Sequence, residues 1–201
     1  MPRSLSAVRA AAARCHNCEL WKHATQTVFG EGPSRAQLML VGEQPGNDED
    51  LAGRPFVGPA GRILDQALAA AGIDRKETYV TNVVKHFKWE PRGKRRIHQR
   101  PNTEEIRACR PWFEAEVQRV QPRIVLCLGA TAAQALISPT FRVTRQHGIQ
   151  FPSAFGPMIA ATVHPASILR APNPEAREAA YTGFVEDLRK VAAAASVKAG
   201  S

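Results

Sequence analysis

Residues 37–46 read Gln-Leu-Met-Leu-Val-Gly-Glu-Gln-Pro-Gly, and this stretch decides the fold class. Its first half is an apolar run of strand length that ends at Gly42, which is typical of a strand buried on both faces. Similar runs follow at residues 79–84, 123–128 and 158–163, with segments of helical spacing between them. Strands that alternate with helices predict a mainly parallel sheet covered on both faces. We therefore expect an α/β fold with three αβα layers around a central four-stranded sheet.

The helices of this fold are expected between and after the strands. They span residues 61–71, 102–120, 130–137 and 175–195. Pro111 lies inside the second of them and predicts either a kink or a new helix start. An Arg- and Ala-rich segment at residues 3–14 is expected to be a short surface helix that leads into Cys15, rather than an organelle transit peptide.

The composition is that of one compact globular domain. The chain has 201 residues, of which 44% are hydrophobic and 22% charged, and these values exclude a disordered or fibrous protein. We therefore treat residues 1–201 as a single domain. No apolar run approaches the roughly 18 residues of a membrane span, and no secretory signal follows Met1. We expect a cytoplasmic monomer with no membrane partner.

The charge indicates a polyanionic partner. The formal net charge is +9, and it is concentrated in residues 85–100, where seven basic residues face the single Glu90. We expect residues 91–100 to form a basic loop that faces phosphates. The alternatives are a solvated loop and a localisation signal.

Polar residues gather where the predicted strands end. In parallel sheets, ligands bind beyond the carboxyl ends of the strands. Glu43 and Gln44 follow the first strand, Asn82 lies in the second, and His164 follows the fourth. Gly129-Ala-Thr131 follows the third strand and is expected to begin a helix rather than to cradle a phosphate. The sequence therefore predicts a site at this edge of the sheet.

The four cysteines suggest a metal centre. Cys15 and Cys18 have the spacing of metal ligands, whereas Cys109 and Cys127 lie 18 residues apart. They meet the first pair only if the N-terminal segment folds back on the core. Four thiolates suit zinc or a [4Fe–4S] cluster, and the spacing leaves both open. The alternative for Cys127, in an apolar strand, is an ordinary buried thiol.

Several motifs occur together in a recognisable order. They are Gly42-Glu-Gln-Pro-Gly46, Gly53-Arg-Pro-Phe-Val-Gly-Pro-Ala-Gly61, Thr81-Asn-Val-Val-Lys85 and His164-Pro-Ala-Ser-Ile-Leu-Arg170. With the cysteines, the set resembles the uracil-DNA glycosylase superfamily over roughly residues 15–190, and within it the iron–sulfur family 4 branch. Lys94-Arg-Arg-Ile-His98 is similar to the insertion typical of the UdgX group, and Gln44 fits that group as well. Asn47 departs from the pattern, since close relatives are expected to have an acidic residue there.

The resemblance implies a specific chemistry. A UdgX protein is expected to excise uracil, preferably from single-stranded DNA, and then to remain covalently attached to C1′ of the sugar through His98. Glu43 would orient and deprotonate His98, or would activate water in its absence. His164 is expected to donate a hydrogen bond to uracil O2, where negative charge develops. The implied cofactor is a [4Fe–4S] cluster on Cys15, Cys18, Cys109 and Cys127, with zinc as the alternative.

The remaining candidate residues bind uracil or DNA. Phe56 is expected to stack on the flat base, and the Asn82 amide to pair with N3–H and O4 and so to reject cytosine. Gly42, Gln44, Pro45 and Asp50 are expected around the base, with Asp48, Glu49 and Asp50 compensating for Asn47. Arg96 and Arg170 are expected to brace the loop or hold phosphate. The expected contacts to the DNA backbone are Lys85, Lys88, Lys94 and Arg95.

Two other functions stay open at this point. One is a conventional family 4 uracil-DNA glycosylase that turns over many times and releases free uracil. The other is a non-catalytic module that binds uracil or damaged DNA and holds a structural metal. The joint presence of Glu43, Asn82 and His164 argues against the second.

Overall fold

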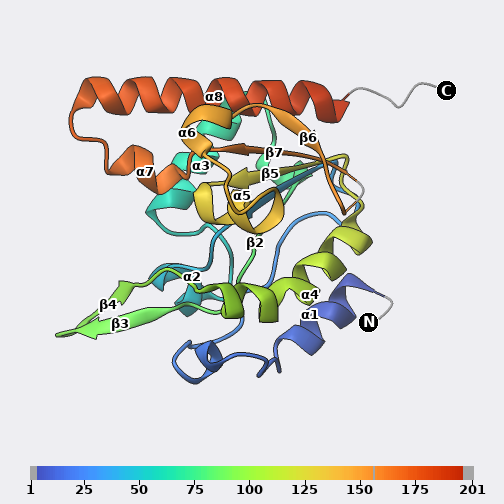
Figure 1. The fold of residues 1–201 in the computed structure, drawn as a ribbon, viewed down its shortest axis with the longest axis vertical. Helices are drawn as coiled ribbons and strands as arrows, with labels where there is room; N and C mark the ends of the chain where they lie inside the picture. The colour runs from blue at the N-terminus through green and yellow to red at the C-terminus, as the bar shows by residue number, and fades with distance from the viewer. Residues whose placement is uncertain (1–3, 156, 197–201) are drawn as a thin grey trace.

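The computed structural model describes residues 4–155 and 157–196. One five-stranded sheet lies at its centre, in the order β2-β1-β5-β7-β6 (Figure 1). The strands are β1 (Leu38–Gly42), β2 (Thr78–Asn82), β5 (Ile124–Leu128), β6 (Gln150–Pro152) and β7 (Met158–Thr162). Four of them are parallel, and β6 pairs antiparallel with β7. The α/β class and the mainly parallel sheet are confirmed, and the expected count of four strands is wrong by one edge strand.

Strand β6 has a physical reason for escaping the sequence pattern. It is only three residues long, and it ends in Pro152, which has no N–H to donate to a ladder. Gly148, at a φ of 72°, turns the chain just before it. A strand this short, with one neighbour, needs no alternation of apolar and polar residues.

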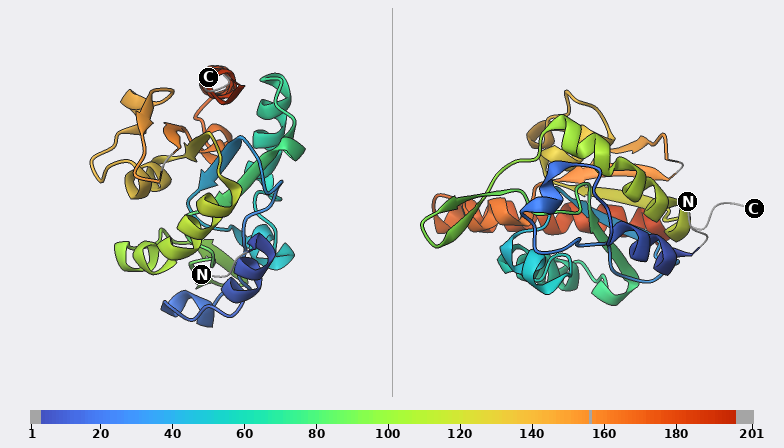
Figure 2. Two further views of the ribbon diagram at one scale, coloured as in Figure 1. Left: turned by 90° about the vertical axis from the view of Figure 1, so that its right-hand side faces the viewer. Right: turned by 90° about the horizontal axis from the view of Figure 1, so that it is seen from below.

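Two helical layers cover the sheet (Figure 2). On one face, α4 (Thr103–Val120) and α5 (Ala130–Leu136) pack against Met39 and Val41 of β1. On the other face, α3 (Pro59–Ala70) and α8 (Pro174–Ser196) pack against Leu38 and Leu40. Because both faces are covered, every residue of β1 is buried, which explains its continuous apolar run.

The N-terminal segment packs beneath α4. The expected helix is α1 (Leu5–Ala12), which begins after Ser4, whose Oγ accepts a hydrogen bond from Ala7 N. Val8 and Ala12 pack against Ala115 of α4, which confirms a helix docked on the core. The short 3₁₀ helix η1 (Glu19–Lys22) begins directly after Cys18.

The basic segment is a β-hairpin, not the loop expected at residues 91–100. β3 (Trp89–Arg92) pairs antiparallel with β4 (Arg95–His98), and the pair projects away from the body of the molecule (Figure 1). Gly93, at a φ of 59°, lies in the turn. Most side chains of the hairpin are exposed, so burial imposes no alternating pattern by which the sequence would reveal it.

The remaining elements are short: α2 (Asn47–Ala52), η2 (Arg75–Glu77), α6 (Val143–Gln146) and α7 (Pro165–Leu169). The other expected strands and helices agree with the structure to within a few residues, and α4 continues through Pro111. Within the described part of the chain, no helix combines the length and apolarity needed to cross a bilayer.

Candidate active site

A cavity of about 760 Å³ opens where β1, β2, β5 and β7 end, as the rule for parallel sheets predicts. Seven of the predicted residues line it: Glu43, Gln44, Phe56, Asn82, His98, His164 and Arg170. Four others lie outside the lining, namely Gly42, Pro45, Asp50 and Arg96. The structure thus brings together residues from the four ordered motifs and from the insertion that contains His98.

Phe56 lies in the cavity in a restricted backbone conformation. Its φ is +55°, in the left-handed region that bulky residues seldom adopt. A side chain at Gly61 would collide with the Phe56 carbonyl, and one at Gly42 would collide with the Phe56 ring and the Asn82 amide. Gly42 therefore contributes by having no side chain. The Phe56 ring lies 6.0 Å from the His164 ring, centroid to centroid.

Asn82 is the last residue of β2, and its amide lies beside Gly42 and Phe56. Its Oδ1 is buried and has no hydrogen-bond partner among the described residues. A buried acceptor without a donor costs about 1–3 kcal/mol. An acceptor in this position is suited to a ligand N–H.

His164 presents a proton donor to the cavity. It caps α7, and its Nδ1 accepts a hydrogen bond from Ala166 N at 3.1 Å. Burial, together with the positive charge of Arg170, lowers the His164 pKa to about 4, although Glu43 opposes the shift. The ring is therefore neutral at pH 7, and because Nδ1 accepts, Nε2 carries the proton. Gly129, at a φ of 95°, lacks the side chain that would collide with His164.

Glu43 and His98 form a pair at the mouth of the cavity. His98 Nε2 lies 3.2 Å from Glu43 Oε1, and the His98 side chain is 49% exposed. Burial alone would raise the Glu43 pKa, but hydrogen bonds from His98 and Thr131 outweigh it, so that the pKa is lowered. Glu43 is thus a carboxylate that holds one ring nitrogen of a solvent-accessible imidazole.

The hairpin that carries His98 is fixed at its base by Gln44. The Gln44 amide donates to the carbonyls of Lys88 and Gln99, and its oxygen accepts from Lys88 N, all at 3.0–3.1 Å. Trp89 Nε1 donates to the carbonyl of His23 at 3.0 Å. Gln44 therefore lines the cavity while it holds both strands of the hairpin.

Arg96 and Asp50 brace the hairpin and do not line the cavity. For Arg96 this is one of the two roles expected from the sequence, whereas Asp50 was expected at the substrate. Arg96 Nη1 donates to Asp50 Oδ2 at 2.6 Å, and Arg96 Nε donates to Asn47 Oδ1 at 2.9 Å. The Asp50 carboxylate is fully buried and also accepts from Thr25 N. Asn47, at the position where an acidic residue was expected, thus accepts a hydrogen bond from the same guanidinium group.

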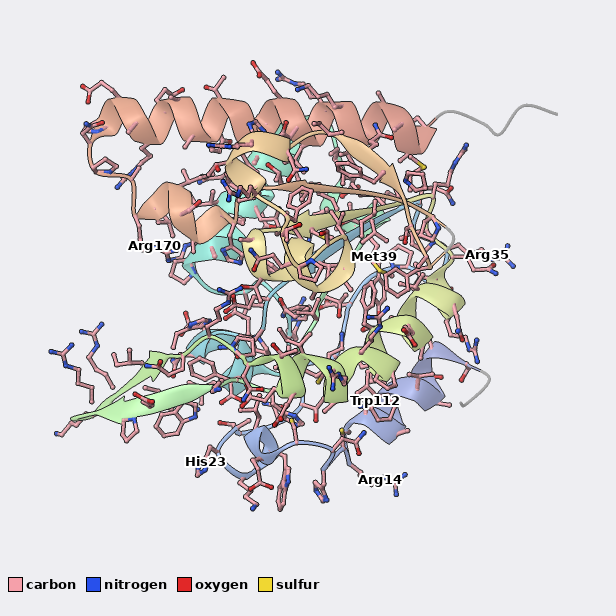
Figure 3. The ribbon with its side chains drawn as sticks, viewed as in Figure 1. Arg14, His23, Arg35, Met39, Trp112 and Arg170 are labelled. Atoms are coloured by element: carbon pink, nitrogen blue, oxygen red, sulfur yellow. The ribbon has the colours of Figure 1, made fainter. Side chains whose placement is uncertain are left out.

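Lys85 requires a second correction. Its side chain is 1% exposed, and Nζ donates to Glu116 Oε2 at 2.6 Å, so it is not a contact to DNA. Lys94 and Arg95 are exposed at the tip of the hairpin, and Lys88 is paired with Glu105 at 2.9 Å. The exposed Arg170 lies beside α7 at the other side of the cavity (Figure 3).

Thr131 and Glu49 take part in the site in ways that the sequence did not indicate. Thr131 lies in the helix start that was correctly expected, yet it also lines the cavity and hydrogen-bonds to Glu43. Glu49 accepts from Gly46 N and from Gly58 N, so it joins the loop after β1 to the loop that carries Phe56. Glycines on both sides of Glu49 were the available signal.

Three of the four cysteines share an environment beneath α4. Cys15 Sγ accepts from Trp112 Nε1 at 3.1 Å, Cys18 from the Leu20 backbone, and Cys109 from Lys85 N at 3.3 Å. Figure 3 shows Trp112 at the junction of α4 and the N-terminal segment. Burial raises the Cys109 pKa to about 11, with Cys18 and Cys15 adding to the shift. The Cys127 pKa, in contrast, is raised by burial alone.

Comparisons with known proteins agree with this site. The sequence pattern of the family described as "Uracil DNA glycosylase superfamily" matches residues 29–189. The Type-4 uracil-DNA glycosylase of Pyrobaculum aerophilum is 38% identical over 165 residues, which are 79% of this chain and 81% of that protein. The protein of the same description from Sulfurisphaera tokodaii is 33% identical, over 85% and 78% of the two chains. That from Thermotoga maritima is 34% identical, over 88% and 87%. The chain therefore belongs to the uracil-DNA glycosylase superfamily.

Proposed function

We propose that this protein excises uracil from DNA and then captures the exposed sugar through His98. Membership of the superfamily and the names of the relatives support uracil excision. The observation that carries the capture step is the contact between His98 Nε2 and Glu43 Oε1, 3.2 Å long, in the same cavity as Asn82 and His164.

The cavity is suited to recognising uracil by its edge and its face. The unpaired Asn82 Oδ1 accepts N3–H, the amide nitrogen donates to O4, and Phe56 stacks on the ring. Cytosine has no N3–H and carries an amino group at position 4, so both hydrogen bonds would be lost. A site built in this way rejects the wrong ligand strongly, because its own buried groups are then left unpaired.

His164 assists departure of the base. As the C1′–N1 bond breaks, its electron pair moves onto uracil, and charge develops at O2. The Nε2–H of neutral His164 donates to O2 at that moment, and one such donor is worth about 3–4 kcal/mol of barrier. The low pKa of His164 opposes uptake of a second proton, so the ring acts as a hydrogen-bond donor and not as a general acid.

His98 completes the reaction. After the C1′–N1 bond has broken, the lone pair of an imidazole nitrogen forms a bond to the cationic C1′, and the imidazole proton passes to Glu43. Uracil departs as the anion and takes a proton from water. Proximity favours the ring over water, since His98 is held on a braced hairpin. A C–N bond to imidazole has no good leaving group, so each molecule would act once.

The exposed basic side chains complete the DNA site. Lys94 and Arg95 at the hairpin tip, and Arg170 across the cavity, would contact phosphates on either side of the flipped nucleotide. Such contacts add affinity that falls with salt. Because a flipped base is reached most cheaply from an unpaired strand, single-stranded DNA is the preferred substrate.

We further propose a [4Fe–4S] cluster beneath α4, with Cys15, Cys18 and Cys109 among its ligands. Each of these sulfurs accepts an N–H bond, as thiolates that hold a cluster commonly do. Among the described residues, no three His, Cys, Asp or Glu side chains converge closely enough for a single ion. A cluster spreads its ligands over four irons and thus suits this wider arrangement better than zinc. It would pin the N-terminal segment to the core.

The capture step is tested with a labelled single-stranded oligonucleotide that contains one uracil. Wild-type protein should give a band that stays shifted after boiling in SDS, and mass spectrometry of the digested band should locate the sugar on His98. His98→Ala should lose the band but still release uracil and leave an alkali-sensitive site. His23→Ala, which removes another exposed histidine, should behave as wild type.

Three outcomes would contradict the proposal. Repeated turnover by wild type without a shifted band would identify a conventional glycosylase, in which Glu43 activates water. No release of uracil by any variant would identify a binding module. A band that persists in His98→Ala would assign capture to another residue.

A further inference from the structure

One buried histidine near the cysteines has an unexplained nitrogen. His86 is 4% exposed, and its Nδ1 has no hydrogen-bond partner among the described residues. Its other nitrogen, Nε2, lies 2.9 Å from Thr27 Oγ1. A buried ring nitrogen without a partner is costly, so its presence needs a reason.

The hydrogen bonds of Thr27 determine which nitrogen of His86 carries the proton. The Thr27 hydroxyl has one proton, and it donates this proton to the Ala12 carbonyl at 3.1 Å. It must therefore accept from His86 Nε2–H. The neutral ring then has a bare lone pair on Nδ1. This arrangement, one nitrogen donating to a fixed partner and the other free, is typical of histidines that bind metal.

The surroundings of His86 are those of the three cysteines. The preceding residue, Lys85, donates its backbone N–H to Cys109 Sγ. The Ala12 carbonyl that receives Thr27 also accepts from Cys15 N at 3.0 Å. His16, between Cys15 and Cys18, is close enough to interact electrostatically with His86. Hydrogen bonds through Thr27 and the Ala12 carbonyl thus connect His86 to Cys15, and its peptide bond to Lys85 brings it close to Cys109.

Cys127 lacks every one of these connections. It lies within β5, opposite Val41 and Ala161, and its environment is that of the apolar core. No N–H donor to its sulfur is found in the described structure, whereas each of the other three has one. The alternative considered for it from the sequence, an ordinary buried thiol, accounts for all of this.

We propose that His86, through Nδ1, is the fourth protein ligand of the metal centre beneath α4, together with Cys15, Cys18 and Cys109. Cys127 is then a core residue. This inference rests on the metal centre proposed above, but not on uracil capture. A neutral nitrogen in place of a thiolate makes the site less negative, which raises the reduction potential of a cluster relative to one held by four cysteines.

The test measures metal in the full-length chain purified without oxygen. Iron, zinc and sulfide per chain are determined together with the absorption near 400 nm, for wild type, His86→Ala, His86→Cys and Cys127→Val. His16→Ala serves as the matched control, since it removes a neighbouring histidine. We expect the metal content of His86→Ala to be at least tenfold lower than that of wild type, whereas Cys127→Val and His16→Ala should retain the wild-type content.

His86→Cys keeps the proposal falsifiable if His86→Ala fails to fold. It should retain the metal, shift the absorption spectrum and lower the reduction potential. Pulsed EPR of the reduced cluster, with ¹⁵N-histidine, should show a nitrogen coupling in wild type that is absent in His86→Cys. If the metal is zinc, cobalt substitution provides a spectrum that reports the same ligand.

Several results would overturn the assignment. Loss of metal in Cys127→Val with retention in His86→Ala would return the fourth position to the cysteine. Identical spectra and potentials for wild type and His86→Cys would exclude nitrogen ligation. A wild-type chain with neither iron nor zinc would remove the metal centre altogether. The uracil assay is read separately, so none of these results would affect the proposed excision and capture.

Discussion

Two pairs of residues that alternate along the chain use their polar atoms in different ways. One pair is Thr81 and Lys85, and the other is Asn82 and His86. Thr81 and Lys85 join Glu116, which also accepts from Gly30 N and Tyr79 OH, and all these groups are buried and paired. Asn82 Oδ1 and His86 Nδ1 are equally buried but unpaired. The saturated set is structural, and the unpaired atoms indicate where a ligand binds.

The largest effect should come from breaking the saturated set. Glu116→Gln removes the charge that faces Lys85 and leaves a buried ammonium uncompensated, which should cost about 3–5 kcal/mol of unfolding free energy. Urea denaturation measures the loss. The double variant Lys85→Met/Glu116→Gln should recover most of it, because it buries no charge and keeps a side-chain oxygen for Gly30 N and Tyr79 OH. A loss below about 1 kcal/mol in the single variant would contradict a structural role for the pair.

Asn82→Ala is the complementary change. It removes an unpaired acceptor, so the unfolding free energy should change by less than about 1 kcal/mol, whereas uracil excision under single-turnover conditions should fall about 10²–10³-fold. Measuring both quantities on one preparation separates the two. If stability fell as much as it does in Glu116→Gln, the Asn82 amide would be structural and the comparison would fail.

His164 predicts a pH dependence of stability. Its pKa is about 4 in the folded protein and near 6.5 when unfolded, so between these values the unfolded chain binds more protons. Stability should therefore fall as the pH falls from about 6.5 to 4, by at most about 3 kcal/mol from this group. His164→Gln should flatten this part of the profile. Denaturation at pH 7 and pH 5 for both proteins provides the test, and equal slopes would refute it.

The smallest effect is expected at Gln44, whose amide is fully paired although it lines the cavity. Gln44→Ala removes three hydrogen bonds at the base of the hairpin. We expect a stability loss of about 1–2 kcal/mol and a reduced yield of covalent adduct, with uracil release largely kept. Hydrogen exchange of residues 88–99 should become faster. Loss of uracil release in proportion to the adduct would show that Gln44 contacts the base directly.

Much of the fold and of the cavity was predictable, because both depend on local patterns. Buried strands read as apolar runs, and the ends of parallel strands meet at one edge, so the sequence alone was enough to group Glu43, Asn82 and His164. The need for glycine at positions 42 and 61 is also explained by near neighbours, since a side chain at either position would collide with Phe56.

Several predictions from the sequence were wrong because they concern residues whose partners are distant in the chain. Lys85 reads as a surface cation until Glu116, 31 residues away, is placed against it. Asp50 and Arg96 are 46 residues apart, so the sequence does not show that they pair, and Asp50 was assigned to the substrate. The hairpin was missed because its side chains are exposed on both faces, and β6 because three residues hold no period. The role proposed for His86 has no signature in the sequence.

The contacts that hold the hairpin determine which step of the proposed reaction is lost first when the protein is damaged. Trp89 and Arg96 fix it to His23 and Thr25, on the same N-terminal stretch that holds Cys15 and Cys18. Asn82, Phe56 and His164 depend instead on the sheet and its loops. Oxidation that freed the N-terminal stretch would therefore loosen the hairpin, which Gln44 and Asp50 still hold, and lower the yield of capture before it affected base removal. On the proposed function, a molecule damaged in this way would create abasic sites and release them, whereas an intact molecule stays covalently attached to the site it creates.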